Sequence, residues 1–173
     1  MANLDARVRL VEEHVRCEND HDLARIMDTF GAEARYDDEP WNEHHEGRDR
    51  VSAYYQTLLS AAPDLHIDVR RRHVSDDAIV LEVVISGTHL GAWRGLPGTG
   101  RHLEFPLCGI YTFDAHDRLS GEKIYYDRAT VLRQIGMFHE PESGIGRVMT
   151  PLMHPATVAR ALGRTLFRRP PSH

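Results

Sequence analysis

Cysteine is scarce in this sequence of 173 residues, which contains only Cys17 and Cys108. The two lie far apart in the chain and form no CxxC motif. Two cysteines do not provide the dense disulfide framework of small secreted domains. We therefore expect both to be reduced residues of the core.

Long apolar runs are also lacking. No stretch approaches the ~20 residues that a membrane-spanning helix needs. The first residues, 1–5, have neither the basic start nor the apolar stretch of a secretory signal. We therefore expect a cytoplasmic protein that has no membrane partner.

Basic residues are few in most of the chain. The net charge is −5, but residues 147–173 contain five arginines and no acid, so residues 1–146 carry −10. Phosphate binding needs a basic face, and an acidic body argues against nucleic acid as a partner.

Apolar periodicity predicts helices first and strands afterwards. The spacing of apolar residues favours helices over 4–17, 21–30 and 49–61, with a brief strand at 34–36 and a polar loop over 37–47. From Leu65 to Asp127 the apolar residues alternate with polar ones, which is typical of long antiparallel strands joined by turns. This order predicts an α+β fold rather than alternating βαβ units.

The end of the chain differs in composition from the rest. We expect one domain over 1–138 and an extension over 139–173 that forms part of the same unit. Thr150-Pro151 is a favourable helix start, and the apolar residues after it line one face of an amphipathic helix. Packing of this helix on protein is preferred over a position on an acidic lipid surface, because its apolar face is rich in alanine.

Two motifs suggest chemistry that their spacing does not support. Glu43-His44-His45-Glu46 places potential metal ligands next to each other, without the HExxH spacing, and is interpreted as a polar loop. The glycine-rich segment 95–101 lacks the Gly-Lys-Ser/Thr ending of a phosphate-binding loop and lies between strands, so it is interpreted as a hairpin connection. We expect no metal and no organic cofactor.

Asp127 ends an apolar, aromatic strand, where an acid is unusual. It has two interpretations with opposite effects on its pKa. As the N-cap of a helix that begins at Arg128, the carboxylate would accept backbone N–H bonds and its pKa would fall. Inside an apolar cavity, desolvation would raise its pKa and make it a usable general acid or base. Spacing alone does not choose between them.

Several segments together resemble the SnoaL-like polyketide cyclases of the nuclear transport factor 2-like superfamily. The more specific matches are the glycine-rich stretch 87–101, with Gly87-Thr88-His89, and Ile124-Tyr125-Tyr126-Asp127 followed by Gln134-Ile135-Gly136. Pro63-Asp64-Leu65 after a helix also fits. The resemblance covers about residues 5–136.

The resemblance implies a cone of curved antiparallel sheet with helices in its open side, a homodimer, and a pocket for an apolar small molecule. It places the family's acid/base aspartate on Asp127, which would remove a proton α to a carbonyl before an aldol ring closure. Candidate pocket residues are Tyr36, Trp41, His89, Trp93, Tyr111 and Tyr125.

Three other functions remain open. A ketosteroid-type isomerisation needs a second, protonated acid or a tyrosine as oxyanion donor, for which Tyr36 or Tyr111 would serve. Epoxide hydrolysis needs an acid–Arg–acid set, and Arg128 beside Asp127 is expected to point away. The third alternative is a dimeric ligand-binding domain without catalysis.

Overall fold

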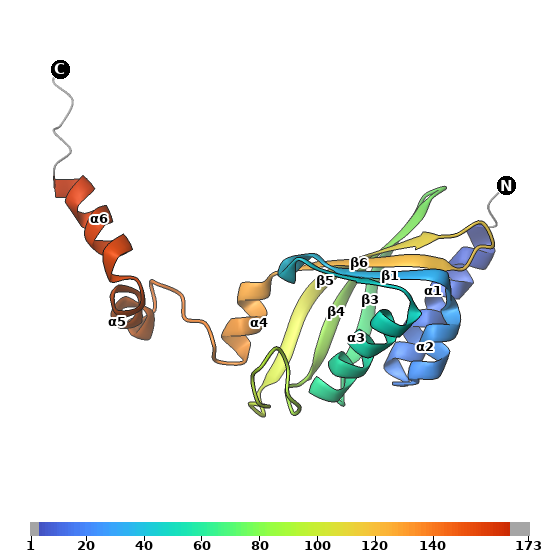
Figure 1. Ribbon diagram of the computed structural model, residues 1–173, viewed down its shortest axis with the longest axis horizontal. Helices are drawn as coiled ribbons and strands as arrows, with labels where there is room; N and C mark the ends of the chain where they lie inside the picture. The colour runs from blue at the N-terminus through green and yellow to red at the C-terminus, as the bar shows by residue number, and fades with distance from the viewer. Residues whose placement is uncertain (1–3, 167–173) are drawn as a thin grey trace, which may run out of the picture. The chain divides into compact units, whose positions relative to one another are not determined.

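The computed structural model describes residues 4–166, and its contacts divide the chain into two units, Met1–Ile135 and Gly136–His173. The first unit begins with helices and continues as a sheet (Figure 1). Its elements are α1 Leu4–Asn19, α2 Leu23–Thr29, β1 Phe30–Asp38, the 3-10 helix η1 Glu39–Trp41, β2 Glu43–Glu46, α3 Arg48–Ala61, β3 His66–Val74, β4 Ala78–Thr88, β5 His102–Phe113, β6 Leu119–Tyr126 and α4 Arg128–Gln134.

The six strands form one curved sheet in the order β2-β1-β6-β5-β4-β3. Strands β3 to β6 are an antiparallel meander, as the alternation of apolar residues predicted. β1 pairs with β6 in parallel, with Tyr36 opposite Glu122, so the first strand lies next to the last one in the sheet. The predicted α+β class and curved sheet are therefore confirmed, with one parallel pair, β1 with β6, in an otherwise antiparallel sheet.

The core lies between the sheet and the helices. Alternate residues of β4, from Ile79 to Ile85, are buried, and α1, α2 and α3 lie over this face of the sheet (Figure 1). Alternation with period 2 puts the apolar side chains of a strand on one face, where helices exclude water from them. Cys17 is buried here, whereas Cys108 is only partly buried, and both are free thiols.

The prediction of a polar loop over 37–47 is wrong. β1 runs on to Asp38, and residues 43–46 form β2, which pairs with β1 in antiparallel register. Acidic residues are tolerated at this strand end because their carboxylates have partners. Asp37 accepts hydrogen bonds from Arg35, and its Oδ1 lies 2.7 Å from His44 Nδ1. Alternation alone does not reveal such pairs.

The second unit contains two helices, α5 Gly144–Met153 and α6 Pro155–Leu166. The predicted helix start at Thr150-Pro151 is wrong, because Ser143 caps α5 by accepting the Gly146 N–H and Pro151 lies inside that helix. That 139–173 forms part of the same unit as the cone stays a prediction. Within residues 4–166, no helix is both long and apolar enough to cross a bilayer.

Candidate active site

A mainly apolar cavity of about 90 Å³ lies inside the curved sheet. Its walls come from α3 and from β3 to β6, with contributions from α1 and the connection after β4. Apolar side chains such as Leu58, Val83, Ile85, Phe105 and Leu107 supply most of the lining. An enclosed apolar cavity with a few polar groups is the usual form of a small-molecule site.

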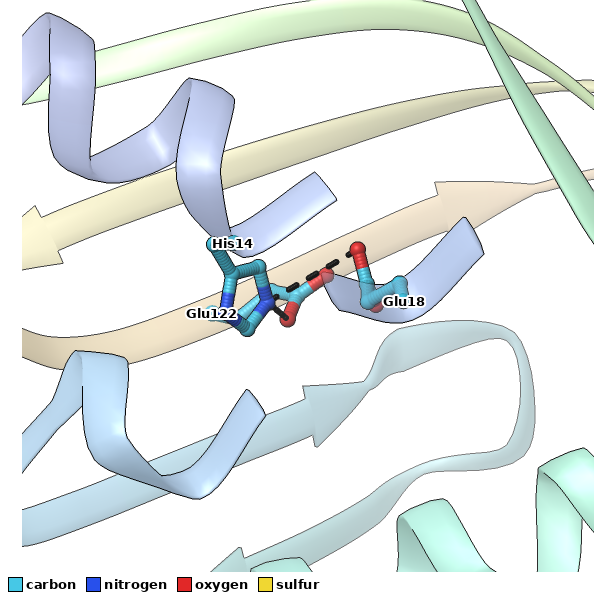
Figure 2. Close-up of side chains that lie close together, drawn as sticks. All are labelled: His14, Glu18 and Glu122. Carbon is cyan, nitrogen blue, oxygen red and sulfur yellow. Dashed lines mark hydrogen bonds and ion pairs between the residues drawn. The ribbon is translucent and has the colours of Figure 1, made fainter. Parts of the chain in front are cut away.

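Three ionisable side chains meet at one part of this cavity (Figure 2). His14 and Glu18 lie one turn apart on α1, so they share a helix face. Glu122 reaches them from the inward face of β6. His14 Nε2 lies 3.3 Å from a Glu122 oxygen and 3.7 Å from a Glu18 oxygen. All three side chains are buried, and both glutamates line the cavity.

The orientation of the His14 ring follows from its neighbours. The Thr29 hydroxyl donates to the carbonyl of Ile26 at 2.6 Å, so it accepts from His14 Nδ1–H at 2.7 Å. The other ring nitrogen, Nε2, faces the Tyr55 hydroxyl oxygen at 3.0 Å and the Glu122 carboxylate. The Tyr55 hydroxyl donates to the same Glu122 oxygen at 2.5 Å. Both ring nitrogens therefore face acceptors, which fits a doubly protonated imidazolium.

Burial changes the proton affinity of this cluster. Desolvation raises the pKa of Glu18 to about 8, even though His14 opposes the shift. For His14, burial lowers the pKa, but Glu18 and Glu122 raise it by more, and the net result is a pKa above its ordinary value. At neutral pH the cluster therefore keeps a proton on Glu18. A buried carboxyl group with a raised pKa beside a second carboxyl group is an arrangement found in acid/base catalysis.

This proton uptake predicts how stability depends on pH. The pKa of Glu18 rises from 4.5 to about 8 on folding, so the folded chain binds the proton more tightly. The stabilisation is complete below pH 4.5 and is lost as pH rises towards 8, by at most about 1.4 kcal/mol per pH unit. His14 acts in the same direction. Urea unfolding between pH 5 and 8.5 should show a decline in the native chain that is weaker in Glu18→Gln. Parallel curves would contradict the shift.

The same three residues could offer ligand atoms to a metal ion, because one atom from each lies within 4.8 Å of the others. Asp37, Glu39 and His44 form a second such group among the described residues. In the first group, the Tyr55 hydroxyl already donates to the Glu122 oxygen that faces His14. In the second, Arg35 and Lys123 balance the charge of Asp37. Both groups are thus held together by protons and cationic side chains of the chain itself.

Asp127 lies at the N-cap of α4 and is exposed. Its carboxylate accepts hydrogen bonds from the backbone N–H groups of Ala129 and Thr130 and from the Thr130 hydroxyl. The Thr130 hydroxyl and these N–H groups lower the pKa of Asp127. Asp127 is not among the residues that line the cavity. This geometry matches the interpretation of Asp127 as the N-cap of a helix, in which its pKa falls.

The other predicted pocket residues divide into two groups. Tyr36, His89, Trp93 and Tyr111 line the cavity. Tyr125 alternates with the inward residues of β6, is exposed, and lies in a hollow on another part of the surface. Trp41 does not line the cavity. It donates a hydrogen bond to the hydroxyl of Tyr126, and Tyr126 does line the cavity.

Asp38 forms a second buried polar group, which the sequence did not single out. Its Oδ2 accepts hydrogen bonds from Arg94 at 2.7 Å and from the hydroxyls of Tyr54 at 2.9 Å and Tyr126 at 3.3 Å. Burial raises the pKa of Asp38, although Tyr54 and Arg94 oppose this shift. Tyr54 and Tyr126 also line the cavity, and both contact Asp38, so each connects the Asp38 carboxylate to the cavity wall.

Arg94 is held on several sides. Its guanidinium carbon lies 4.2 Å from the ring centre of Trp41 and 5.0 Å from that of Trp93, and Arg94 also pairs with Glu43. Its backbone has a φ of 51°, in the left-handed region that non-glycine residues rarely adopt. An acid–Arg–acid set is therefore present, as Asp38, Arg94 and Glu43 rather than as residues around Asp127.

The sequence contains partial signals for the cluster of His14, Glu18 and Glu122. His14 and Glu18 interrupt the apolar stripe of the first helix, which includes Val11 and Val15, and polar residues there must be buried with partners. Glu122 lies on the inward face of β6 together with Ile124. The contact between the helix and the strand is not visible in the sequence, because 104 residues separate Glu18 from Glu122.

Known proteins share this architecture. A family model described as SnoaL-like polyketide cyclase matches residues 8–135. Comparison with curated proteins gave no match. Among solved structures, AclR, a putative hydroxylase from Streptomyces galilaeus, is 20% identical with a TM-score of 0.69, covering 80% of this chain and 89% of that chain.

Two further structures have similar scores. IdmH, a putative polyketide cyclase from Streptomyces antibioticus, is 19% identical with a TM-score of 0.63 and covers 75% and 98% of the two chains. SalBIII, an epoxide hydrolase/cyclase-like enzyme of salinomycin pyran ring formation, is 15% identical with a TM-score of 0.64 and covers 74% and 95%. These identities establish the shared fold alone, whereas the family model covers most of the chain. The chain belongs to the SnoaL-like polyketide cyclase family.

Proposed function

We propose that this protein catalyses proton transfer α to a carbonyl of an apolar small molecule, as in a cyclisation or isomerisation, and that the cluster of His14, Glu18 and Glu122 performs the chemistry. One observation carries the proposal: two buried glutamates line a mainly apolar cavity, and the buried His14 lies beside both. Family membership supports it, since named activities of proteins with this fold include cyclases. In this proposal, Asp127 caps α4 and takes no part in the chemistry.

The two glutamates have different roles in this scheme. Glu122, as carboxylate, removes the proton from the carbon next to the carbonyl, and the C–H electrons form an enolate. Glu18, which keeps its proton at neutral pH because of its raised pKa, donates a hydrogen bond to the enolate oxygen. In a cyclisation, the enolate carbon attacks a second carbonyl of the same molecule, and the alkoxide that forms takes the proton now held by Glu122. In an isomerisation, the substrate is conjugated, and the dienolate takes that proton back from Glu122 at its γ carbon. His14 lies beside both glutamates, with Nε2 3.3 Å from Glu122 and 3.7 Å from Glu18.

The first step can be tested without knowing the natural substrate. The protein is incubated in D₂O with a panel of apolar cyclic and aromatic ketones and 1,3-diketones, and deuterium at the α carbon is measured by mass spectrometry. We expect exchange above the buffer rate for members that enter the cavity. Tight binding of these compounds without any exchange would instead support the alternative, a dimeric ligand-binding domain.

Asp127→Asn separates the two candidate aspartate roles. Asparagine caps a helix about as well as aspartate but takes up no proton. We expect this variant to keep its melting temperature and its α-exchange rate, because the Asp127 carboxylate is exposed and engaged with α4. A folded Asp127→Asn protein that has lost exchange would return the acid/base role to Asp127.

A second candidate function is hydrolysis of an epoxide. The observation that favours it is the acid–Arg–acid set of Asp38, Arg94 and Glu43, in which Asp38 Oδ1 is buried and has no hydrogen-bond partner among the described residues. That oxygen would orient a water molecule. The candidate ranks second because Asp38 is not in the cavity lining. Release of a diol from apolar epoxides, lost in Asp38→Asn and kept in Glu122→Gln, would favour it over proton transfer.

A further inference from the structure

His89 is a buried polar residue that the proposed chemistry does not use. It lines the cavity and is 2% exposed. Its Nδ1 lies 3.1 Å from the hydroxyl of Thr99, whereas Nε2 is buried and has no hydrogen-bond partner among the described residues. Buried polar atoms are almost always paired, and an unpaired one costs free energy. An unpaired nitrogen in the wall of an apolar cavity therefore points to a partner supplied by a ligand.

Strand register places His89 far from the glutamates. Glu122 of β6 lies opposite Tyr111 of β5, which lies opposite Ile79 of β4. His89 follows β4 ten residues after Ile79, so it lies just past the opposite end of that strand. The wall between the two ends is apolar and includes Val83 and Ile85. The cavity therefore has one polar end at Glu18 and Glu122 and another at His89.

The chain around His89 is fixed before any ligand binds. The His89 N–H donates to the carbonyl of Arg101, and its own carbonyl accepts from Gly100, both at 2.9 Å. A side chain at position 98 would place its Cβ 2.0 Å from the carbonyl oxygen of Leu90, so only glycine fits there. The guanidinium of Arg94, in the same connection, lies against the rings of both Trp41 and Trp93. A rigid polar group loses little entropy on binding.

We propose that His89 Nε2 binds an oxygen function of the ligand at the end remote from the reacting carbon. The ligand class is then an elongated, mainly apolar carbonyl compound with a hydroxyl or second carbonyl near its other end. The assignment of the reacting end rests on the proposed function, whereas the contact with His89 does not.

Matched probes test this contact directly. The probes are 2-alkanones from 2-pentanone to 2-octanone, chosen to suit a small cavity, each paired with its ω-hydroxy counterpart, and binding is measured by titration calorimetry. One hydrogen bond gained by the hydroxyl predicts about 5- to 10-fold tighter binding for the counterpart of matching length. In His89→Phe, the ratio of the dissociation constants of the plain ketone and its hydroxy counterpart should fall to about 1. His102→Phe is the matched control, because His102 is exposed, and it should keep the native ratio.

The test also covers a His89→Phe protein that fails to fold. In the native protein, ¹⁵N NMR of the histidine rings should show His89 Nε2 shifting with the hydroxy probe and not with the plain ketone. Equal binding of both probes to the native protein, a ratio that persists in His89→Phe, or an unmoved Nε2 resonance would each overturn the proposal. Glu122→Gln should lose α-exchange and keep the ratio, so failure of the proposed function is recognised separately.

Discussion

Glu122→Gln is expected to lower α-proton exchange by at least about 100-fold, the effect of removing a general base. The substitution keeps the shape of the side chain and its hydrogen bond from Tyr55 but leaves no carboxylate to take up a proton. Rates are measured by deuterium incorporation for whichever ketone of the panel exchanges fastest with the native protein. Binding of that ketone should change far less than its exchange rate.

Glu82→Gln is the matched control for this prediction. Glu82 lies on the outward face of β4, where it is exposed and its Oε1 lies 2.9 Å from His73 Nε2. It should leave the exchange rate unchanged. A Glu122→Gln protein that is folded and exchanges at the native rate would show that the base lies elsewhere.

Arg94→Ala should have the largest effect on stability. Asp38 is fully buried, and loss of Arg94 removes its cationic partner. Leaving a buried carboxylate without its partner costs about 3 kcal/mol of unfolding free energy. The loss should be smaller at acidic pH, since burial already raises the pKa of Asp38 and a neutral carboxyl tolerates burial better. Urea unfolding at pH 5 and pH 8 measures both effects.

Two variants check the cause of that loss. Arg35→Ala removes a half-exposed arginine from the buried Asp37, which keeps His44 and Lys123 as partners, and should cost less stability than Arg94→Ala. Asp38→Asn combined with Arg94→Ala should recover part of the loss, because no buried charge remains. A double variant as unstable as the sum of its single variants would indicate that Arg94 acts through packing on Trp41 and Trp93 alone.

The helices and the meander were predictable because each depends on residues close in sequence. The apolar stripe of α3 and the alternation along β4 both appear within one element. The parallel pairing of β1 with β6 and the strand at 43–46 were not predicted, since they depend on contacts between distant segments. Pro151 was interpreted as a helix start, whereas Ser143 caps that helix eight residues earlier.

The candidate site was predicted less well than the fold. The sequence identified Asp127 because an acid there is conspicuous, yet its carboxylate is satisfied locally by α4. The His14 cluster brings together α1 and β6, and its raised proton affinity comes from burial, which no local pattern measures. Four of the predicted pocket residues, Tyr36, His89, Trp93 and Tyr111, do line the cavity.

The most direct measurement of the central claim is a pH titration of the glutamate side chains by ¹³C NMR, with Glu18→Gln used to assign the Glu18 carboxyl resonance. We predict that Glu18 keeps its proton through neutral pH and titrates near pH 8. A Glu18 carboxyl that titrates near its ordinary value of 4.5 would contradict a protonated donor beside Glu122, and with it the acid/base cluster on which the proposed function depends.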